Sequence, residues 1–247
     1  MKKNVGILGI GEVGKAIKKL AEKEFNIYCK DVDFDEIEGN KIDVLHICIP
    51  YTKNFIKIVV KNIKEINPEL VIINSTIEPG TTRKIFKKTK VFTAHVPIMG
   101  VHPDLAKYQK IFIKAIGAVN SQSFKLAKKH WEKLGSKKIV KFDGPEETEL
   151  AKLLSTTYYL ANIIFNKTAK KLTDKSKTNF KQVYWQFNEI YNNGYKQVDK
   201  NLQRQILKYM AGPIEGHCVI SNAKILNKTY KDSLIDFLLR FNSKLKK

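Results

Sequence analysis

The stretch Gly9-Ile10-Gly11-Glu12-Val13-Gly14 constrains the fold of this chain more than any other feature. It follows an apolar run with the character of a buried strand, residues 3–9, and precedes a helical pattern over residues 15–24. G-x-G-x-x-G between a strand and a helix permits a tight turn, close approach of backbone to a pyrophosphate, and close helix–strand packing. Phosphates bind at such a helix N-terminus because its free N–H groups and dipole favour anions. The stretch therefore predicts a dinucleotide site that includes all six residues.

A second strand-like segment, residues 25–30, ends at Asp31, which lies 22 residues after Gly9. An acidic side chain at this place accepts hydrogen bonds from the adenosine ribose hydroxyls and repels a 2′-phosphate. Asp31 therefore favours NAD over NADP, with Lys30 beside it as an opposing charge. The structural alternative is a glycine-rich turn followed by an aspartate that only caps a helix.

Strand and helix patterns keep alternating through the first 144 residues. Strands are predicted at residues 42–49, 70–74, 91–94, 111–116 and 138–142, with a helix at about 54–66. This alternation is typical of an α/β Rossmann fold, a doubly wound parallel sheet that binds ligands at the carboxyl ends of its strands. Pro50, Tyr51 and Thr76 follow two of these strands and are further candidates for cofactor contact. His46 and Cys48, inside a strand, are interpreted as packed core residues.

The second half of the chain reads as helical. A boundary is predicted near residues 143–145, which divides an NAD-binding Rossmann domain (1–144) from an all-helical substrate and dimerisation domain (145–247). A long helix is predicted over 146–171, because acids come first, bases last and apolar residues recur at helical spacing. Further helices are predicted within 178–208, with a break at 192–194, and a terminal helix from about Asp232.

The amino-acid composition of the chain limits the binding partners and the cellular compartment that we expect for it. The formal net charge is +21, but the lysines are spread along the whole chain, which argues against a nucleic-acid footprint and leaves a field that attracts phosphorylated small molecules. No apolar run is long enough to cross a bilayer, so no membrane partner is expected. Three widely spaced cysteines do not form a disulfide framework and indicate a reduced, cytoplasmic protein. No metal site is expected, since His217 and Cys218 are adjacent and lack C-x-x-C or H-x-x-x-H spacing.

The segment GPIEGHCVISN (212–222) leaves three roles open for Cys218: nucleophile, metal ligand or small core residue. Together with four other patches it resembles the nucleotide-sugar dehydrogenases, the UDP-glucose and UDP-N-acetylmannosamine 6-dehydrogenase group. The other patches are GILGIGEVG, ICIPYT, NSTIEPGTT and TELAKLLSTTYY. These patches have the order and separation of the family's motifs.

The resemblance implies an NAD-dependent dehydrogenase that acts on the CH–OH group of a sugar or nucleotide-sugar-like substrate. In that family an alcohol is oxidised to an aldehyde and then to a carboxylate. Carried over by residue, Cys218 is the nucleophile that captures the aldehyde as a thiohemiacetal, which is then oxidised to a thioester. Lys152 stabilises the oxyanion, and Thr76 contacts the nicotinamide or positions water. The helix over 146–171 implies a homodimer.

The chain also departs from the family. Residues 95–98 contain no acid where the family has a glutamate, and Thr156 and Asn222 replace an asparagine and an aspartate. His95, His102 and His217 are alternative acid–base groups. The printed chain ends at Lys247, before the family's third, UDP-binding domain. These departures support an alternative: a dinucleotide-binding sensor or partner subunit that has lost turnover.

Overall fold

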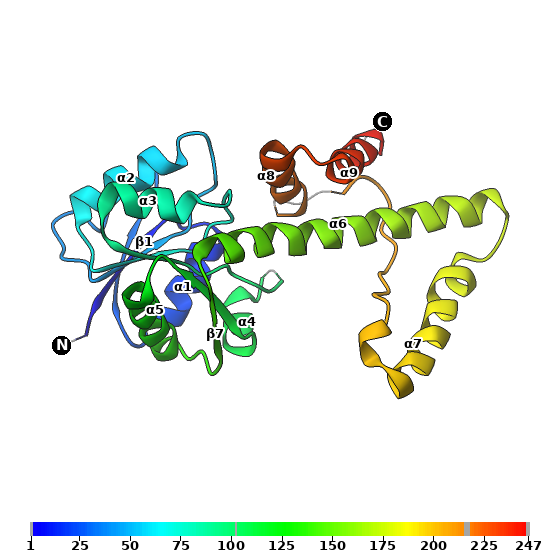
Figure 1. Cartoon of the computed structure of the whole chain (residues 1–247), viewed down its shortest axis with the longest axis horizontal. Helices are drawn as coiled ribbons and strands as arrows, with labels where there is room; N and C mark the ends of the chain where they lie inside the picture. Colours follow the sequence, from blue (N-terminus) through cyan, green and yellow to red (C-terminus); the bar gives the residue numbers. More distant parts are fainter. Residues whose placement is uncertain (1, 102, 215–217, 246–247) are drawn as a thin grey trace. The chain divides into compact units, whose positions relative to one another are not determined.

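The structure, a computed structural model, describes residues 2–101, 103–214 and 218–245 (Figure 1). It divides into two compact units, Met1–Lys152 and Leu153–Lys247. The boundary predicted at residues 144 and 145 stays a prediction.

The first unit is built on one seven-stranded sheet. Its strands are β1 (Asn4–Leu8), β2 (Asn26–Lys30), β3 (Val44–Ile47), β4 (Leu70–Ile73), β5 (Phe92–His95), β6 (Lys114–Ala118) and β7 (Ile139–Phe142). They lie in the order β2-β1-β3-β4-β5-β6-β7. The predicted α/β fold is confirmed, and β1 to β5 pair in parallel. The expectation of a fully parallel sheet is corrected at one place, because β6 runs antiparallel to β5.

Helices cover both faces of this sheet (Figure 1). They are α1 (Glu12–Ala21), α2 (Phe55–Ile66), α3 (Thr81–Thr89), α4 (Leu105–Ile111) and α5 (Ser121–Lys133). Neighbouring residues of one strand point to opposite faces: Ile72 packs with α1, α4 and α5, whereas Ile73 packs with α2 and α3. Because both faces are buried, the strands read as continuous apolar runs rather than as alternating patterns.

A chain of buried polar groups crosses this core. The His46 Nδ1 atom lies 2.7 Å from the Asn74 Oδ1 atom, and the Asn74 amide donates to the Val96 carbonyl at 2.7 Å. His46 therefore carries its proton on Nδ1, and its Nε2 accepts from Nε2 of His130, 2.9 Å away. Burial lowers the pKa of His46 to about 4 and that of His130 well below its ordinary value. Both rings are neutral packed residues, as predicted for His46.

The second unit is helical over its described residues. The long helix α6 (Pro145–Lys175) begins in the first unit and extends into the second. After it come a π-helical turn (Lys181–Gln186), α7 (Phe187–Val198), a 3₁₀ turn (Lys200–Leu202), α8 (Val219–Tyr230) and α9 (Ser233–Lys244). Asp232 caps α9 by accepting the Leu234 and Ile235 N–H groups, in agreement with the predicted start.

The break predicted at 192–194 is wrong, because α7 continues to Val198. Tyr191 and Tyr195 stack one turn apart on either side of Gly194. The Arg204 guanidinium lies 3.8 Å from the Tyr191 ring centroid. The Asn192 amide also donates to the Arg204 carbonyl. These contacts offset the weak helix propensity of an Asn-Asn-Gly sequence, which is about 1 kcal/mol for the glycine.

Within the described part of the chain, no helix is long and apolar enough to cross a membrane. Tyr158 and Phe165 on α6 are each 65% exposed, so they do not form part of a core within this chain. The expectation of a homodimer through this helix stays a prediction.

Candidate functional site

The fold requires two of the three glycines in the turn after β1 and does not require the third. Gly9 has a φ of +93°, and a Cβ atom on Gly14 would lie 2.0 Å from the Gly9 carbonyl oxygen. Gly11 has an ordinary φ of −71°, and a Cβ atom there would meet nothing within 4 Å. The space in front of Gly11, at the N-terminus of α1, is therefore open. Such a place suits a pyrophosphate that must approach the backbone closely.

Asp31 is bonded directly to this turn. Its carboxylate accepts the Ile10 N–H at 2.6 Å and the Val32 N–H at 2.8 Å, and these bonds hold the pKa of Asp31 below its ordinary value. A carboxylate has about four lone-pair positions, so two remain for ribose hydroxyls. Glu12 is exposed in the first turn of α1, and Val13 is half-buried. The residues predicted to bind a dinucleotide fit such a group.

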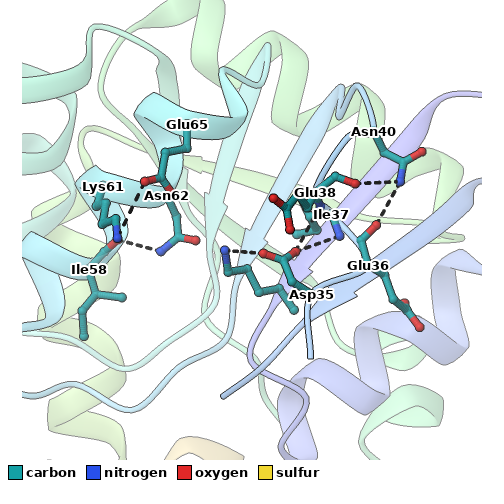
Figure 2. Close-up of polar contacts among 10 residues, drawn as sticks. Asp35, Glu36, Ile37, Glu38, Asn40, Ile58, Lys61, Asn62 and Glu65 are labelled. Carbon is teal, nitrogen blue, oxygen red and sulfur yellow. Dashed lines mark hydrogen bonds and ion pairs between the residues drawn. The ribbon is translucent and has the colours of Figure 1, made fainter. Parts of the chain in front are cut away.

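Lys30, the residue beside Asp31, is held by another acid. Its ammonium lies 2.5 Å from the Asp35 carboxylate. Figure 2 shows that Asp35 also accepts the backbone N–H groups of Ile37 and Glu38, at 3.0 and 3.1 Å. The positive charge of Lys30 is therefore neutralised within the loop that follows β2.

The ends of β3 and β4 lie beside the end of β1 at the carboxyl edge of the sheet. The Ser75 hydroxyl ties the two strands by donating to the Ile49 carbonyl at 2.6 Å. The Tyr51 hydroxyl donates to the Glu78 carboxylate at 2.8 Å, and burial raises the pKa of Tyr51 to about 12. Pro50 is exposed and Thr76 half-buried at the same edge. The structure thus brings the candidate cofactor residues of this unit to one edge.

A buried carboxylate that sequence reasoning missed holds the loop after β4. Glu149 on α6 accepts the Gly80 N–H at 2.5 Å and the Thr82 N–H at 2.8 Å, which caps the start of α3. Arg83 and Glu146 add a bidentate ion pair with distances of 2.6 and 2.8 Å. Burial raises the pKa of Glu149 to about 7, since the two N–H bonds only partly offset desolvation. The sequence signal that could have revealed this role is an acidic residue on the apolar face of the helix predicted over 146–171.

Lys152 lies three residues further along α6. Its ammonium donates to the carbonyl of Ile98 at 2.8 Å. Ile98 lies in the 95–98 stretch, which contains no acid, and it contacts Lys152 through its backbone carbonyl. The segment after β5 thus supplies one hydrogen-bond acceptor for Lys152.

His95 is not placed as an acid–base group. Its ring is fully buried, with Nδ1 2.8 Å from the Thr148 hydroxyl and Nε2 3.3 Å from the Ser75 carbonyl. Burial lowers the pKa of His95 to about 3, so the ring is neutral and is engaged by the protein on both sides. His102 and His217, the other two histidine candidates, lie outside the described residues.

In the second unit, Cys218 is exposed at the N-cap position of α8. The other two cysteines differ: Cys29 is buried and Cys48 is half-buried, and burial raises the pKa of both thiols. Asn222, one turn into α8, is buried and its amide donates to the Thr156 hydroxyl at 3.1 Å. Thr156 and Asn222, the two positions that are expected from the sequence to differ from the family that it resembles, therefore contact each other.

Among the described residues, no group of three or more His, Cys, Asp or Glu side chains is arranged to hold a metal ion.

Comparison with known proteins extends over most of the chain. The UDP-N-acetyl-D-mannosamine dehydrogenase of Methanocaldococcus jannaschii is 28% identical over 243 residues, which cover 86% of this chain and 54% of that protein. The Methanococcus vannielii enzyme of the same name is 27% identical over 227 residues, or 84% and 50% of the two chains. This chain is a homologue of the nucleotide-sugar dehydrogenases. It spans about half the length of the curated relatives that it matches, and no protein-family model matches it.

Solved structures support the same fold. The UDP-D-ManNAc dehydrogenase of Pyrococcus horikoshii superposes with a TM-score of 0.79 at 19% identity, covering 98% of this chain and 68% of that one. A 3-hydroxyisobutyrate dehydrogenase of Mycobacterium tuberculosis gives 0.73 at 12% identity and covers 99% of this chain and 94% of that one. The combination of a Rossmann unit and a helical unit therefore occurs in both kinds of dehydrogenase.

The buried ionisable groups of the first unit predict a steep acid destabilisation. The pKa values of His46, His95 and His130 are depressed, so their contribution to stability is present above about pH 6.5 and is lost as the pH falls. Glu149 acts in the opposite sense, because its raised pKa makes the folded state bind a proton below about pH 7. Three protons minus one gives a net uptake of about two on unfolding between pH 5 and 6, or roughly 3 kcal/mol lost per pH unit.

Urea unfolding between pH 5 and 6 measures this slope, followed by Trp131 fluorescence in a Trp185→Phe background. His130→Gln keeps a donor for His46 and removes one titrating group, so the slope of stability against pH should fall by about half. A stability that is flat or rises as the pH falls through this window would contradict the assignment.

Proposed function

We propose that this chain binds NAD at the glycine turn and Asp31 and oxidises an alcohol of a sugar or a nucleotide sugar. The observation that carries the cofactor assignment is the open space in front of Gly11, which the fold itself leaves unexplained. Homology over most of the chain to UDP-N-acetyl-D-mannosamine dehydrogenases supports the substrate class. NAD is preferred over NADP because Asp31 repels a 2′-phosphate and Asp35 neutralises Lys30.

The residues of this chain have separate roles in the proposed reaction. When bound, each of two successive NAD⁺ molecules would take up one hydride from the substrate carbon, and the proton of the substrate hydroxyl would pass to solvent in the first oxidation. Between the two oxidations, the Cys218 thiolate attacks the aldehyde carbon, so that a C–S bond forms and the carbonyl π pair moves onto oxygen. The Lys152 ammonium stabilises that alkoxide until the second hydride leaves the carbon and a thioester results. Water then cleaves the C–S bond, which gives the carboxylate and returns the thiol.

The backbone contact of Lys152 is consistent with such a role. The Ile98 carbonyl accepts a hydrogen bond from the ammonium at 2.8 Å and so helps to orient it. Cys218 is suited to nucleophilic attack because it is exposed and begins a helix, where backbone N–H groups stabilise anions. Thr76, at the carboxyl edge, is proposed to contact the nicotinamide side of the cofactor.

The first test compares two glycines of the same turn. In Gly11→Ala the methyl group has room in the free protein, so the unfolding free energy should change by less than about 1 kcal/mol. The same methyl occupies the pyrophosphate space, so the Kd for NAD should rise about tenfold or more. Gly14→Ala should instead lower stability by about 3 kcal/mol or more, because its Cβ meets a carbonyl oxygen. Calorimetric titration and urea unfolding measure the two effects; equal NAD affinity in Gly11→Ala contradicts the site.

The second test concerns cofactor preference. Asp35→Asn removes the ion-pair partner of Lys30 and keeps an oxygen to accept the Ile37 and Glu38 N–H groups. The freed ammonium should improve NADP binding by roughly threefold to tenfold and leave NAD binding little changed. Glu65→Gln, which breaks the exposed Lys61–Glu65 pair seen in Figure 2, is the matched control and should change neither affinity. If both variants bind NADP more tightly, the effect does not come from the Asp35–Lys30 ion pair, and the proposed role of Asp35 is wrong.

The third test separates an enzyme from a sensor. The chain is incubated with NAD⁺ and a panel of UDP-, GDP- and unactivated sugars, and the absorbance of the reduced cofactor is followed. Turnover should fall by about 10³-fold or more in Cys218→Ala, since one nucleophile carries the second oxidation. Cys29→Ala is the control, because that thiol is buried away from solvent. NAD binding without turnover on any substrate would indicate a sensor instead.

A further inference from the structure

The segment 207–214, here called the strap, has no regular secondary structure and leads towards Cys218. Several of its backbone polar groups nevertheless form hydrogen bonds, because buried side chains from two helices reach them. Asn166 on α6 donates to the Leu207 carbonyl at 2.8 Å, and Asn242 on α9 accepts the Ile214 N–H at 2.8 Å. Asn242 also donates to the Ile214 carbonyl at 3.2 Å, so its amide pairs with that residue as a neighbouring strand would.

Lys167 holds the middle of the strap. Its ammonium donates to the Met210 carbonyl at 2.5 Å and to the Gly212 carbonyl at 2.7 Å. Two carbonyls two residues apart can face one cation only in a sharply bent backbone, and Gly212 supplies the bend with a φ of +77°. Lys167 is only 8% exposed, and burial lowers its pKa. Within the described residues it has no carboxylate partner, so the two carbonyls are what stabilise its charge.

The neighbouring lysine of α6 is used differently. Lys170 forms an ion pair with Asp174 one turn further along the helix, and no hydrogen bond from it to the backbone of the strap is seen among the described residues. Both lysines face the Tyr209 ring, at 5.5 and 5.8 Å from its centroid. Both also line the same cavity of about 300 Å³. The two side chains thus share surroundings, including the Tyr209 ring, and differ in that Lys167 donates hydrogen bonds to the backbone carbonyls of the strap.

We propose that Lys167 and Asn242 are positioning residues that fix the strap and thereby keep Cys218 at the first turn of α8. Ile214, held on both its N–H and its carbonyl, lies four residues before Cys218. Helix ends fray most readily in their first turn, and a fixed segment just before the helix limits that opening. The Asn222 N–H donates to the Cys218 carbonyl at 3.0 Å, so this one bond reports whether Cys218 keeps its place. The catalytic part of the inference rests on the proposed role of Cys218.

Amide hydrogen exchange tests the strap without any need for activity. In Lys167→Met the Ile214 and Asn222 N–H groups should exchange about tenfold faster or more, because a hydrogen bond to a charged donor is lost from each of two carbonyls. Lys170→Met is the matched control and should leave both amides within about twofold of the parent chain. Lys167→Arg keeps two donors on a cation and should restore most of the protection. Circular dichroism and urea unfolding establish that each variant is folded.

Turnover with NAD⁺ and a UDP-sugar gives the functional readout. The kcat of Lys167→Met should fall about tenfold with KM changed less than about threefold, with recovery in Lys167→Arg, since the strap places the nucleophile rather than the substrate. Asn242→Asp, which keeps the acceptor for Ile214 and loses the donor, provides a second, milder variant. Unchanged exchange in Lys167→Met, or equal acceleration in Lys170→Met, overturns the proposal. Absence of turnover in the parent chain overturns the proposed function, while exchange still decides the strap.

Discussion

The buried carboxylate of Glu149 is the contact on which the geometry of the first unit depends. It accepts the Gly80 and Thr82 N–H groups at the start of α3, where the helix dipole also favours a negative charge. One side chain thereby joins the loop after β4 to the first turns of α6. Lys152 lies one turn further along the same helix, so its position towards Ile98 follows from this cap. Without Glu149 the orphan N–H groups of α3 would be buried without partners, which costs about 1–3 kcal/mol each.

Polar side chains also hold irregular backbone segments by hydrogen bonds near the other candidate site residues. Asp31 holds the turn after β1 through Ile10, Ser75 holds the ends of β3 and β4, and Asn242 holds Ile214. In each case a short polar side chain satisfies a backbone group that no ladder or helix reaches, as buried polar groups require. Rigid helices and strands thus fix irregular segments that could otherwise move. Gly11 and Cys218 differ from these segments, since one has open space before it and the other is exposed.

Local sequence patterns predicted much of this arrangement, and long-range contacts account for the rest. The glycine turn, β1, β3, β4 and α6 could be predicted because each depends on neighbouring residues in the chain. The reversal of β6 could not, since the apolar pattern of a strand is the same in either direction. Nor could the cap by Glu149, whose partners lie 67 and 69 residues earlier. The helix through Gly194 was missed because stacked tyrosines and Arg204 outweigh local propensity there.

The pairing of Thr156 with Asn222 bears on the two positions at which the sequence is expected to depart from the family that it resembles. The amide of Asn222 donates to the hydroxyl of Thr156 at 3.1 Å, so a neutral hydrogen bond joins α6 to α8. A carboxylate buried as deeply as Asn222, which is 5% exposed, would lose hydration and need further donors. The surroundings of residue 222 therefore suit a neutral amide better than an aspartate, and the two helices keep this contact without a buried charge.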